Sequence, residues 1–247
     1  MSTTGDVVVL PDPELMAAAA AARLVTALVD AQAARGRAHW VLTGGTSGTA
    51  LLSALAASPA RAAVNWKAVD LWWGDERFLP AGHPDRNETQ AREVLLDGLD
   101  LDPDRVHPMA ASDGPWGSDV DAAAAGYAAD LATAAGDGDG VPLFDVLLLG
   151  VGPDGHVASL FPGHPGFAVR EGTSIAVRDS PKPPPTRISL TLPALASARQ
   201  TWLLAAGEGK AEVVARAVAG DAELPSAAVR GRERTLWLLD AAAAGGL

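Results

Sequence analysis

The sequence predicts an α/β protein with an open, mainly parallel sheet and helices on both faces of that sheet. Short apolar segments rich in valine, leucine and tryptophan alternate with longer alanine-rich segments along almost the whole chain. That alternation is typical of parallel α/β sheets. Residues 144–149 are apolar at all but one position, as expected of a strand that is buried on both faces.

The first half of the chain divides into strands that are each followed by a helix. We expect strands over residues 7–10, 38–43 and 69–74. We expect helices over residues 13–34, over a segment that opens at 43–48 and runs through Ala57, and over residues 87–96. Asp12 precedes the first helix at the N-cap position, where a carboxylate accepts hydrogen bonds from free backbone N–H groups. Residues 75–86 are polar and are predicted to form a loop, and a short strand is predicted near Val106.

The second half of the chain is predicted to contain more strands than helices. An alanine-rich helix over residues 118–135 leads through the glycine-rich loop 136–140 to the strand at 144–149. Further strands are expected over residues 174–177, 187–191, 201–206 and 235–239, with a helix over residues 209–219. Because no shift in composition marks a linker, residues 1–247 are predicted to form a single domain.

The composition limits the classes of protein and partner. The 247 residues include 19 basic and 30 acidic side chains, and the net charge of −11 argues against nucleic acid or an anionic membrane as a partner. Apolar stretches end well short of a membrane span, and no cationic leader with an apolar core precedes the first strand. The chain has no cysteine, which excludes disulfides and a thiolate nucleophile. We therefore expect a cytoplasmic protein, a monomer or weak homo-oligomer, that would need a local basic pocket for an anionic small molecule.

The most informative segment is the glycine-rich loop that follows the strand at 144–149. Its glycines, which allow the backbone to approach a ligand beyond the carboxyl end of the strand, are Gly150, Gly152 and Gly155. The loop matches G-x-G-x-x-G, the pattern of dinucleotide-binding proteins. However, Pro162 and Pro165 stop any helix begun at Asp154 after about two turns, and a dinucleotide site needs a full helix there. We therefore reject dinucleotide binding.

His156 ends this loop and is the predicted general base. Asp154 stands two residues before it, and a neutral imidazole can take a proton from water near neutral pH. The alternative for His156, and the default for the other four histidines, is a purely structural role. No group of histidines or carboxylates has the spacing of metal ligands, so a metal is not implied.

A second glycine-rich segment is predicted to bind a phosphate. It lies between an expected strand and an expected helix, where backbone N–H groups and the helix dipole attract anions. The candidate residues are Gly44, Gly45, Thr46 and Ser47. The segment lacks the Gly-Lys-Ser/Thr ending of a nucleotide P-loop. The alternative interpretation is a tight turn in which a Thr or Ser caps the helix.

An acidic and basic cluster follows the expected strand at 69–74, at the same edge of the sheet. Arg77 could hold a phosphate through two parallel hydrogen bonds, and Asp75 or Glu76 could orient a histidine or a sugar hydroxyl. The alternative is a solvated cluster of charges that pair with one another.

A proline-rich segment over residues 180–187 carries two further cations, Lys182 and Arg187. The prolines stiffen the backbone and keep it extended, so Lys182 would be presented at low entropic cost. The alternative is a surface connection or a docking segment.

Four motifs follow one another along the chain, and together they cover nearly all of it. They are LTGGTSG at 42–48, WWGDERFLP at 72–80, LLLGVGPDGHVASLFPG at 147–163 and SPKPPPTRISLTLPAL at 180–195. In this order they resemble the 6-phosphogluconolactonases of the oxidative pentose phosphate pathway. The resemblance implies a Rossmann-like sheet shared with glucosamine-6-phosphate deaminases and ribose-5-phosphate isomerases. It also implies hydrolysis of 6-phospho-D-glucono-1,5-lactone to 6-phosphogluconate without metal or cofactor.

The resemblance also implies roles for individual residues. His156 would be the general base, with Asp75 as its electrostatic or orienting partner. The phosphate would be held by Gly45, Ser47, Arg77, Lys182 and Arg187. Opening a lactone also requires donors for the oxyanion, and we expect them among the backbone N–H groups of the glycine-rich loop, at Gly152, Asp154 and Gly155.

One residue departs from the family pattern, and two other functions are disfavoured. Arg86 stands where a small residue is frequent, and it could add to the phosphate site or face solvent. Amino-sugar phosphate deaminase-isomerases have a similar loop that continues with Asn-Glu-Pro, whereas this chain continues with Ser159-Leu-Phe-Pro162. A non-catalytic sugar-phosphate sensor is disfavoured because His156 and Asp75 are both retained.

Overall fold

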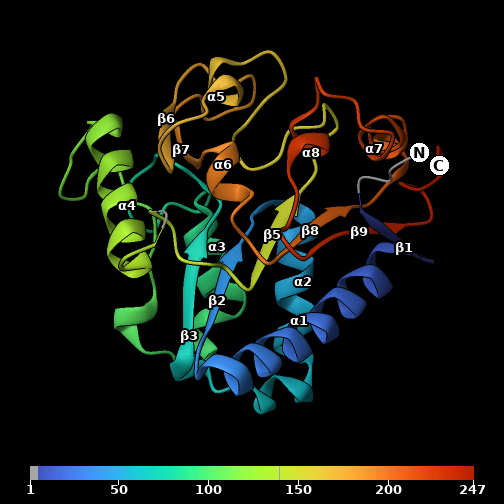
Figure 1. Ribbon diagram of the computed structural model, residues 1–247, viewed down its shortest axis with the longest axis horizontal. Helices are drawn as coiled ribbons and strands as arrows, with labels where there is room; N and C mark the ends of the chain where they lie inside the picture. Colours follow the sequence, from blue (N-terminus) through green and yellow to red (C-terminus); the bar gives the residue numbers. More distant parts are fainter. Residues whose placement is uncertain (1–4, 139) are drawn as a thin grey trace.

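The centre of the fold is a six-stranded sheet in which every pair of neighbouring strands is parallel (Figure 1). The computed structural model describes residues 5–138 and 140–247. The strand order is β1-β9-β8-β5-β2-β3. The strands are β1 (Asp6–Leu10), β2 (Ala38–Leu42), β3 (Val69–Trp73), β5 (Val146–Gly150), β8 (Gln200–Ala205) and β9 (Arg234–Asp240). The predicted open, mainly parallel sheet is confirmed.

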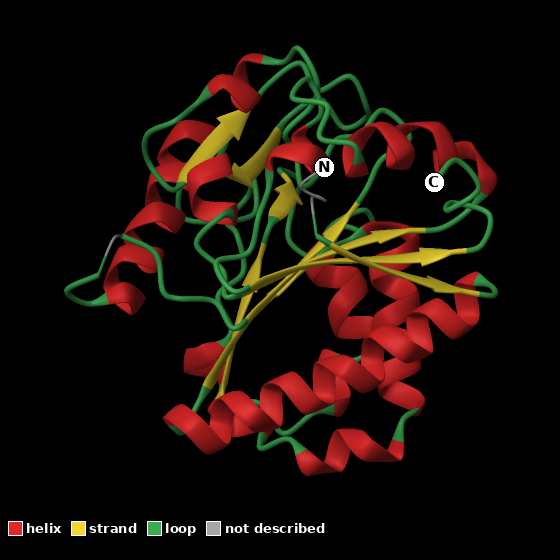
Figure 2. Cartoon of the chain, turned by 45° about the vertical axis from the view of Figure 1, so that its right-hand side comes forward, coloured by secondary structure: helices red, strands yellow, loops and turns green. Residues whose placement is uncertain are grey.

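Helices cover both faces of this sheet (Figure 2). One face packs against α1 (Pro13–Arg35), α2 (Gly45–Ala57) and α3 (Asn87–Val94), and the other packs against α4 (Val120–Ala135) and α7 (Ala211–Val218). Within β5, Val146 and Leu148 join the first core, whereas Leu147 and Leu149 join the second. Successive side chains of a strand point to opposite faces, so a sheet covered on both sides requires an apolar run without alternation.

Residues at its two ends, Asp12 and Gly36, determine where the first helix begins and ends. The Asp12 carboxylate accepts a hydrogen bond from the backbone N–H of Leu15 at 2.7 Å, as the sequence predicts. Gly36 ends the helix with a φ of 77°, a left-handed conformation that glycine adopts without steric cost.

A second, antiparallel sheet was not predicted. It has the order β4-β7-β6 and consists of β4 (Asp75–Arg77), β7 (Arg187–Leu190) and β6 (Ser174–Val177). The sequence predicted a loop at 75–86 because Asp and Glu have low strand propensity, and β4 forms through its pairing with β7. Its register sets Arg77 opposite Arg187. This pairing brings two motifs that lie far apart in the sequence to one place.

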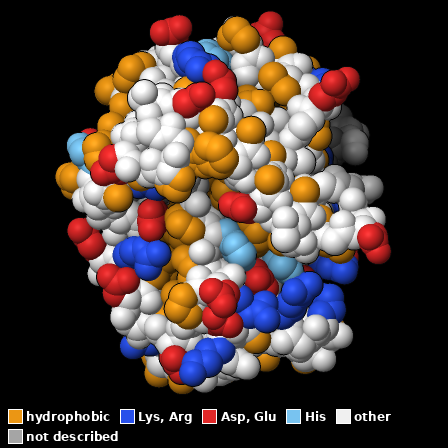
Figure 3. Space-filling view, turned by 90° about the vertical axis from the view of Figure 1, so that its left-hand side faces the viewer, with side chains coloured by type: hydrophobic (Ala, Val, Ile, Leu, Met, Phe, Trp, Pro, Cys, Tyr) orange, Lys and Arg blue, Asp and Glu red, His pale blue; other side chains and the backbone are white. Residues whose placement is uncertain are grey.

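The remaining elements are short. They are the helices α5 (Pro165–Ala168), α6 (Leu192–Leu195) and α8 (Pro225–Ala228) and the 3-10 turns Pro59–Ala63, Trp66–Ala68, Leu96–Gly98, Pro103–Arg105 and Glu208–Lys210. The strand predicted near Val106 is a single bridge to Leu71. Among the described residues, no helix is both long and apolar enough to span a membrane. Acidic and basic side chains are interspersed over the face shown in Figure 3.

The topology creates a crevice at the carboxyl edge of the large sheet. β2 and β5 are neighbours, but the chain leaves β2 toward β3 on one side, and the next strand of this sheet after β5 is β8 on the other. The loops that follow β2 and β5 therefore diverge, which is the arrangement that leaves room for a ligand in open α/β sheets.

Candidate active site

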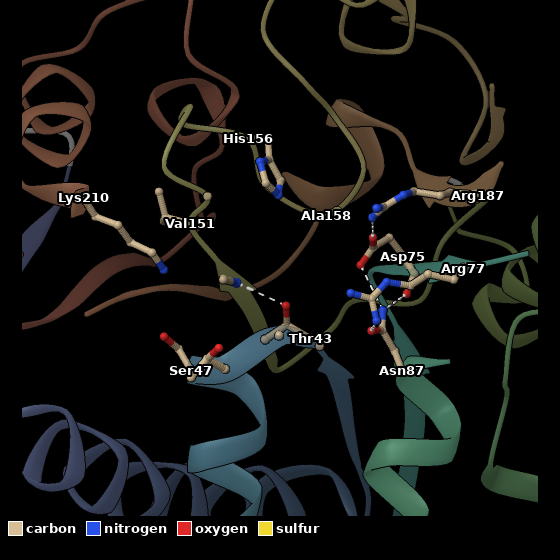
Figure 4. Close-up of a pocket in the computed structure, with 15 residues that line it drawn as sticks. Thr43, Ser47, Asp75, Arg77, Asn87, Val151, His156, Ala158, Arg187 and Lys210 are labelled. Carbon is tan, nitrogen blue, oxygen red and sulfur yellow. Dashed lines mark hydrogen bonds and ion pairs between the residues drawn. The ribbon is translucent and has the colours of Figure 1, made fainter. Parts of the chain in front are cut away.

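A polar pocket lies in this crevice, where the loops after β2, β3 and β5 meet (Figure 4). Its lining residues are Thr43, Gly44, Gly45, Thr46, Ser47, Asp75, Arg77, Asn87, Gly150, Val151, Gly152, His156, Ala158, Arg187 and Lys210. Most of the predicted site residues are among them. The exceptions are Lys182, Asp154 and Gly155, which are not among the described residues that line the pocket.

The start of α2 forms one wall and is open to an anion. Gly44 is the N-cap, and no side chain accepts a hydrogen bond from the first turn. The backbone N–H groups of that turn therefore remain available to a ligand. Gly44 must be a glycine because a Cβ there would lie 1.9 Å from Asn87 Oδ1, and Gly45 has a φ of 74°. This geometry suits the predicted phosphate cradle.

His156 is oriented by Asp154. Its Nδ1 lies 2.5 Å from Asp154 Oδ1, which leaves Nε2 as the ring nitrogen available for proton transfer in the pocket (Figure 4). The ring packs against Phe161 with centroids 4.6 Å apart. Burial alone would raise the pKa of Asp154, but the hydrogen bond and charge of His156, together with the charge of Lys182, hold that pKa well below its usual range. Asp154 is therefore a carboxylate at neutral pH.

Gly152 makes room for this pair. A Cβ at Gly152 would lie 2.1 Å from both Nδ1 and Cε1 of His156 and 2.7 Å from Asp154 Oδ1. The glycine therefore permits the imidazole and the carboxylate to lie over the backbone of the loop.

The predicted oxyanion donors need correction. Within the described structure, the backbone N–H of Gly152 donates to His156 O at 3.0 Å, and that of Gly155 donates to Gly152 O at 2.9 Å. The backbone N–H of Gly150 donates to Thr43 Oγ1 at 3.1 Å. The loop uses these donors to hold its own shape, so they are not free to bind a ligand oxygen.

Asp75 is not positioned by a bond to His156. Its Oδ2 accepts a hydrogen bond from Ser159 Oγ at 2.6 Å, and its backbone carbonyl accepts one from Asn87 Nδ2 at 2.8 Å. The partners that His156 Nδ1 has in the described structure are Asp154 and Lys182. The carboxylate that contacts His156 is therefore that of Asp154 and not that of Asp75. Asp75 lines the pocket, where a sugar hydroxyl could reach one of its oxygens.

Glu76 points away from the pocket and holds the start of α3. Its side chain is 1% exposed and accepts hydrogen bonds from the backbone N–H groups of Arg77, Asn87 and Glu88 at 2.8, 2.7 and 2.9 Å. Burial raises its pKa to about 7, although Arg86 and these hydrogen bonds oppose the shift. Glu76 thus sets the position of Asn87 and contacts no ligand in the pocket.

Asn87 in turn orients Arg77, a link that the sequence analysis missed. Arg77 Nη1 donates to Asn87 Oδ1 at 2.8 Å and to the carbonyl of Asp85 at 2.7 Å. The second terminal nitrogen of Arg77 makes no hydrogen bond within residues 5–138 and 140–247, and Arg77 lines the pocket (Figure 4). Arg77 therefore has a donor free for an anion.

Arg187 lines the pocket, but its guanidinium is already hydrogen-bonded. It donates to the carbonyls of Pro184 at 3.1 Å, Lys182 at 3.1 Å and Pro183 at 3.0 Å, and to Ser159 Oγ at 3.4 Å. Its Nη1 has a second N–H with no hydrogen-bond partner among the described residues, so a phosphate contact at Arg187 stays a prediction. The arginine holds the proline-rich segment in place, which the sequence prediction of a phosphate contact did not foresee.

Two predicted cations, Lys182 and Arg86, lie elsewhere than expected. The Lys182 ammonium is 3.3 Å from Asp154 Oδ1 and 3.4 Å from His156 Nδ1. Arg86 is only 1% exposed and donates to the carbonyl of Met109 at 2.7 Å. Both expectations for Arg86 are wrong, since it neither joins the phosphate site nor faces solvent.

Lys210 is the pocket cation that the sequence analysis overlooked. It follows β8 in the turn Glu208–Lys210, and its ammonium has no hydrogen-bond or ion-pair partner in the described part of the chain (Figure 4). Burial lowers the pKa of Lys210 and the charge of Lys182 lowers it further, against the opposing charge of Asp240. Its place just beyond a parallel strand was the signal that could have identified it.

Comparison with known proteins identifies the family. The family model described as glucosamine-6-phosphate isomerases/6-phosphogluconolactonase matches residues 11–237. The chain belongs to this family. Its similarity to individual members covers almost all of its length. It is 65% identical over 248 residues to a 6-phosphogluconolactonase of Streptomyces coelicolor, covering 99% of this chain and 95% of that protein. It is 50% identical over 238 residues to a 6-phosphogluconolactonase of Mycobacterium tuberculosis, covering 96% of each.

Solved structures of the family share the fold. The structure of 6-phosphogluconolactonase from Trypanosoma brucei superposes with a TM-score of 0.83 at 29% identity and covers 100% of both chains. A monomeric glucosamine-6-phosphate deaminase superposes with a TM-score of 0.78 over 98% of this chain at 19% identity. The second likeness shows the fold alone.

Proposed function

We propose that this protein hydrolyses 6-phospho-D-glucono-1,5-lactone to 6-phospho-D-gluconate in the oxidative pentose phosphate pathway. The observation that carries the proposal is that an acid–base group, His156 on Asp154, and an open helix start face the same pocket (Figure 4). Relatives of high identity are named 6-phosphogluconolactonases, which supports this substrate.

The proposed reaction begins with proton transfer to His156. Nε2 takes a proton from a water molecule while the water oxygen bonds to the lactone carbonyl carbon. The Asp154 carboxylate accepts a hydrogen bond from Nδ1 and stabilises the imidazolium that forms. The tetrahedral intermediate then collapses, the bond from its carbon to the ring oxygen breaks, and the imidazolium returns the proton to that oxygen. Water thus supplies the new oxygen of the carboxyl group and the proton of the new hydroxyl group.

We propose that the phosphate binds at the start of α2, between Arg77 and Lys210. Among the described residues, the donors without a partner here are the N–H groups of Gly45, Thr46 and Ser47, the second terminal nitrogen of Arg77 and the Lys210 ammonium. These groups supply the local basic pocket that a protein with a net charge of −11 needs for an anionic substrate. Holding the phosphate fixes the ring so that its carbonyl meets the water at His156.

The experiment is a hydrolysis assay with freshly prepared lactone, because the lactone also opens spontaneously. Acid release measured in a pH-stat should exceed the spontaneous rate in proportion to enzyme concentration. His156→Ala should lower kcat by about 10²–10⁴-fold, the usual contribution of an acid–base group. Its affinity for 6-phosphogluconate should stay within about threefold. A variant that turns over at the original rate would disprove the role of His156, and a protein that never exceeds background would disprove the lactonase proposal.

The deaminase-isomerase alternative makes a separate prediction. Deaminases are expected to have an additional carboxylate after the loop histidine, whereas in this chain that segment contributes Ser159, whose hydroxyl binds Asp75. Incubation with glucosamine 6-phosphate should therefore release no ammonia above background. Brisk release would contradict the lactonase proposal.

Several expectations stay predictions. They are a single domain over residues 1–247, a cytoplasmic location, a monomer or weak homo-oligomer, no nucleic-acid partner, and catalysis without metal or cofactor. The metal prediction is tested by measuring turnover after dialysis against a chelator, which should leave the rate unchanged.

A further inference from the structure

We propose that Lys182 is a positioning residue that acts on His156 both directly and through Asp154, and that it is not a phosphate ligand. The inference rests on the proposed lactonase function and adds a residue to its proton-transfer machinery. Lys182 would place a positive charge beside the imidazole and so favour the return of its proton to the leaving oxygen.

The contacts of the ammonium carry this inference. Lys182 Nζ lies 3.3 Å from Asp154 Oδ1, the same oxygen that lies 2.5 Å from His156 Nδ1. It lies 3.4 Å from His156 Nδ1 itself. One carboxylate oxygen thus serves both groups, and the cation is at the ring nitrogen that faces away from the reacting water.

The backbone at Lys182 is held firmly enough for such a role. Its N–H donates to Ser180 Oγ at 3.3 Å, and its carbonyl accepts hydrogen bonds from that hydroxyl at 2.9 Å and from Arg187 Nη2 at 3.1 Å. The hydrogen bonds of Arg187 therefore fix the segment from which Lys182 reaches Asp154. Proline on the C-terminal side of Lys182 restricts the backbone further.

The electrostatic effect follows from the charges around the ring. Asp154 alone would favour the imidazolium, and a cation beside it opposes that preference. The charged groups near or across the pocket from His156 are Asp154, Lys182, Asp75, Arg77, Arg187 and Lys210. Of these cations, Lys182 is the one whose charged group contacts the ring of His156 within the described structure. Once His156 has taken a proton from water, the nearby ammonium makes it a stronger acid toward the ring oxygen.

The test compares Lys182→Met with Lys182→Arg and with Lys210→Met. Lys182→Met removes the charge and keeps an unbranched side chain. We expect the acidic limb of its kcat/KM profile to move upward by about one pH unit, as removal of a charge in contact should do at a partly exposed site. Its KM at the plateau of the pH profile should change by less than about twofold. Lys182→Arg should return the acidic limb most of the way to its original pH. Lys210→Met should instead raise KM and leave the limb in place.

A double-mutant cycle tests whether the effect passes through Asp154. In an Asp154→Asn background, adding Lys182→Met should still move the limb upward, because the ammonium lies 3.4 Å from His156 Nδ1 and also acts on the ring directly; an unmoved limb there would contradict the direct contact. Lys67→Met is the matched control, because Lys67 is exposed and pairs with Asp100. It should change neither KM nor the limb.

A second measurement is independent of catalysis. The ring signal of His156 in the NMR spectrum, assigned by its loss in His156→Gln, should titrate at higher pH in Lys182→Met than in the unchanged protein. If the protein lacks lactonase activity, the proposed function fails, and this titration still decides the role of Lys182. If the titration of His156 were the same in both proteins, the inference would be overturned. If Lys182→Met raised KM about tenfold and left the acidic limb of kcat/KM in place, Lys182 would be a phosphate ligand instead.

Discussion

Replacing Gly152 by alanine would test whether the geometry of the glycine-rich loop determines catalysis. The new Cβ would lie 2.1 Å from His156 Nδ1 and Cε1 and 2.7 Å from Asp154 Oδ1. Carbon atoms in contact normally lie about 3.5–4.0 Å apart. The imidazole must therefore move by more than about 1 Å, and its bond to Asp154 must change as well.

The expected loss can be worked from this displacement. A misplacement of about 1 Å at a reacting group costs about 10²-fold in rate, which corresponds to about 2.7 kcal/mol of activation free energy. Gly152 is not among the described glycines with a positive φ, so alanine adds no left-handed strain there. We therefore expect kcat to fall by about 10²-fold, with the affinity for 6-phosphogluconate within about threefold because the start of α2 is untouched.

The assay is initial-rate hydrolysis above the spontaneous background, combined with calorimetric titration of 6-phosphogluconate. Gly74→Ala is the matched control at the same edge of the sheet, since the atom nearest to its new Cβ lies 3.6 Å away, at ordinary contact distance. It should retain kcat within about twofold. If Gly152→Ala also retained kcat, His156 would not need the position described, and the reasoning would be refuted.

Three further predictions concern binding and stability. Lys210→Met should raise KM for the lactone by about tenfold or more with a smaller change in kcat, because a desolvated phosphate contact is lost. Steady-state kinetics measure both constants. An unchanged KM would show that Lys210 does not bind the phosphate. Arg86→Met should lower the free energy of unfolding in urea at about pH 9 by about 3–5 kcal/mol, because Glu76, with a pKa of about 7, is ionised there and loses its cation, 3.8 Å away. A loss below about 1 kcal/mol would contradict this account. Burial lowers the pKa of His39 against the charge of Asp70, so below pH 6.5 the unfolded chain binds the proton more readily and stability falls as the pH drops. The difference in unfolding free energy between the unchanged protein and His39→Gln, measured from pH 7.5 to 5, should therefore shift in favour of the variant as the pH falls, and a constant difference would refute the assignment.

Local sequence patterns were sufficient to predict the large sheet. The apolar run at β5 has no alternation because both of its faces are covered, and Asp12 caps α1 because its carboxylate lies beside free N–H groups. Both patterns consist of residues that are close together in the sequence, so they can be recognised without the tertiary structure. The same holds for the open start of α2, where the glycines themselves mark the close approach of the backbone.

The small sheet and the partners of charged side chains could not be predicted in this way. β4 has only three residues, two of them of low strand propensity, and it exists because β7 pairs with it. Lys210 comes from a segment with no motif and reaches the pocket because β8 lies beside β5. The sequence resemblance assigned the orienting carboxylate to Asp75, whereas the fold bonds Asp75 to Ser159 and leaves Asp154 for His156.

The sequence by itself therefore determined the fold class, the edge of the sheet that carries the site, and the histidine and helix start that face each other there. Only the tertiary structure decided which donors remain free. The backbone N–H groups of Gly152 and Gly155 are already hydrogen-bonded within the protein, whereas Arg77 and Lys210 keep donors directed at the pocket. The physical reason is that the type of a polar group is encoded locally, but whether it is already paired depends on contacts between distant parts of the chain.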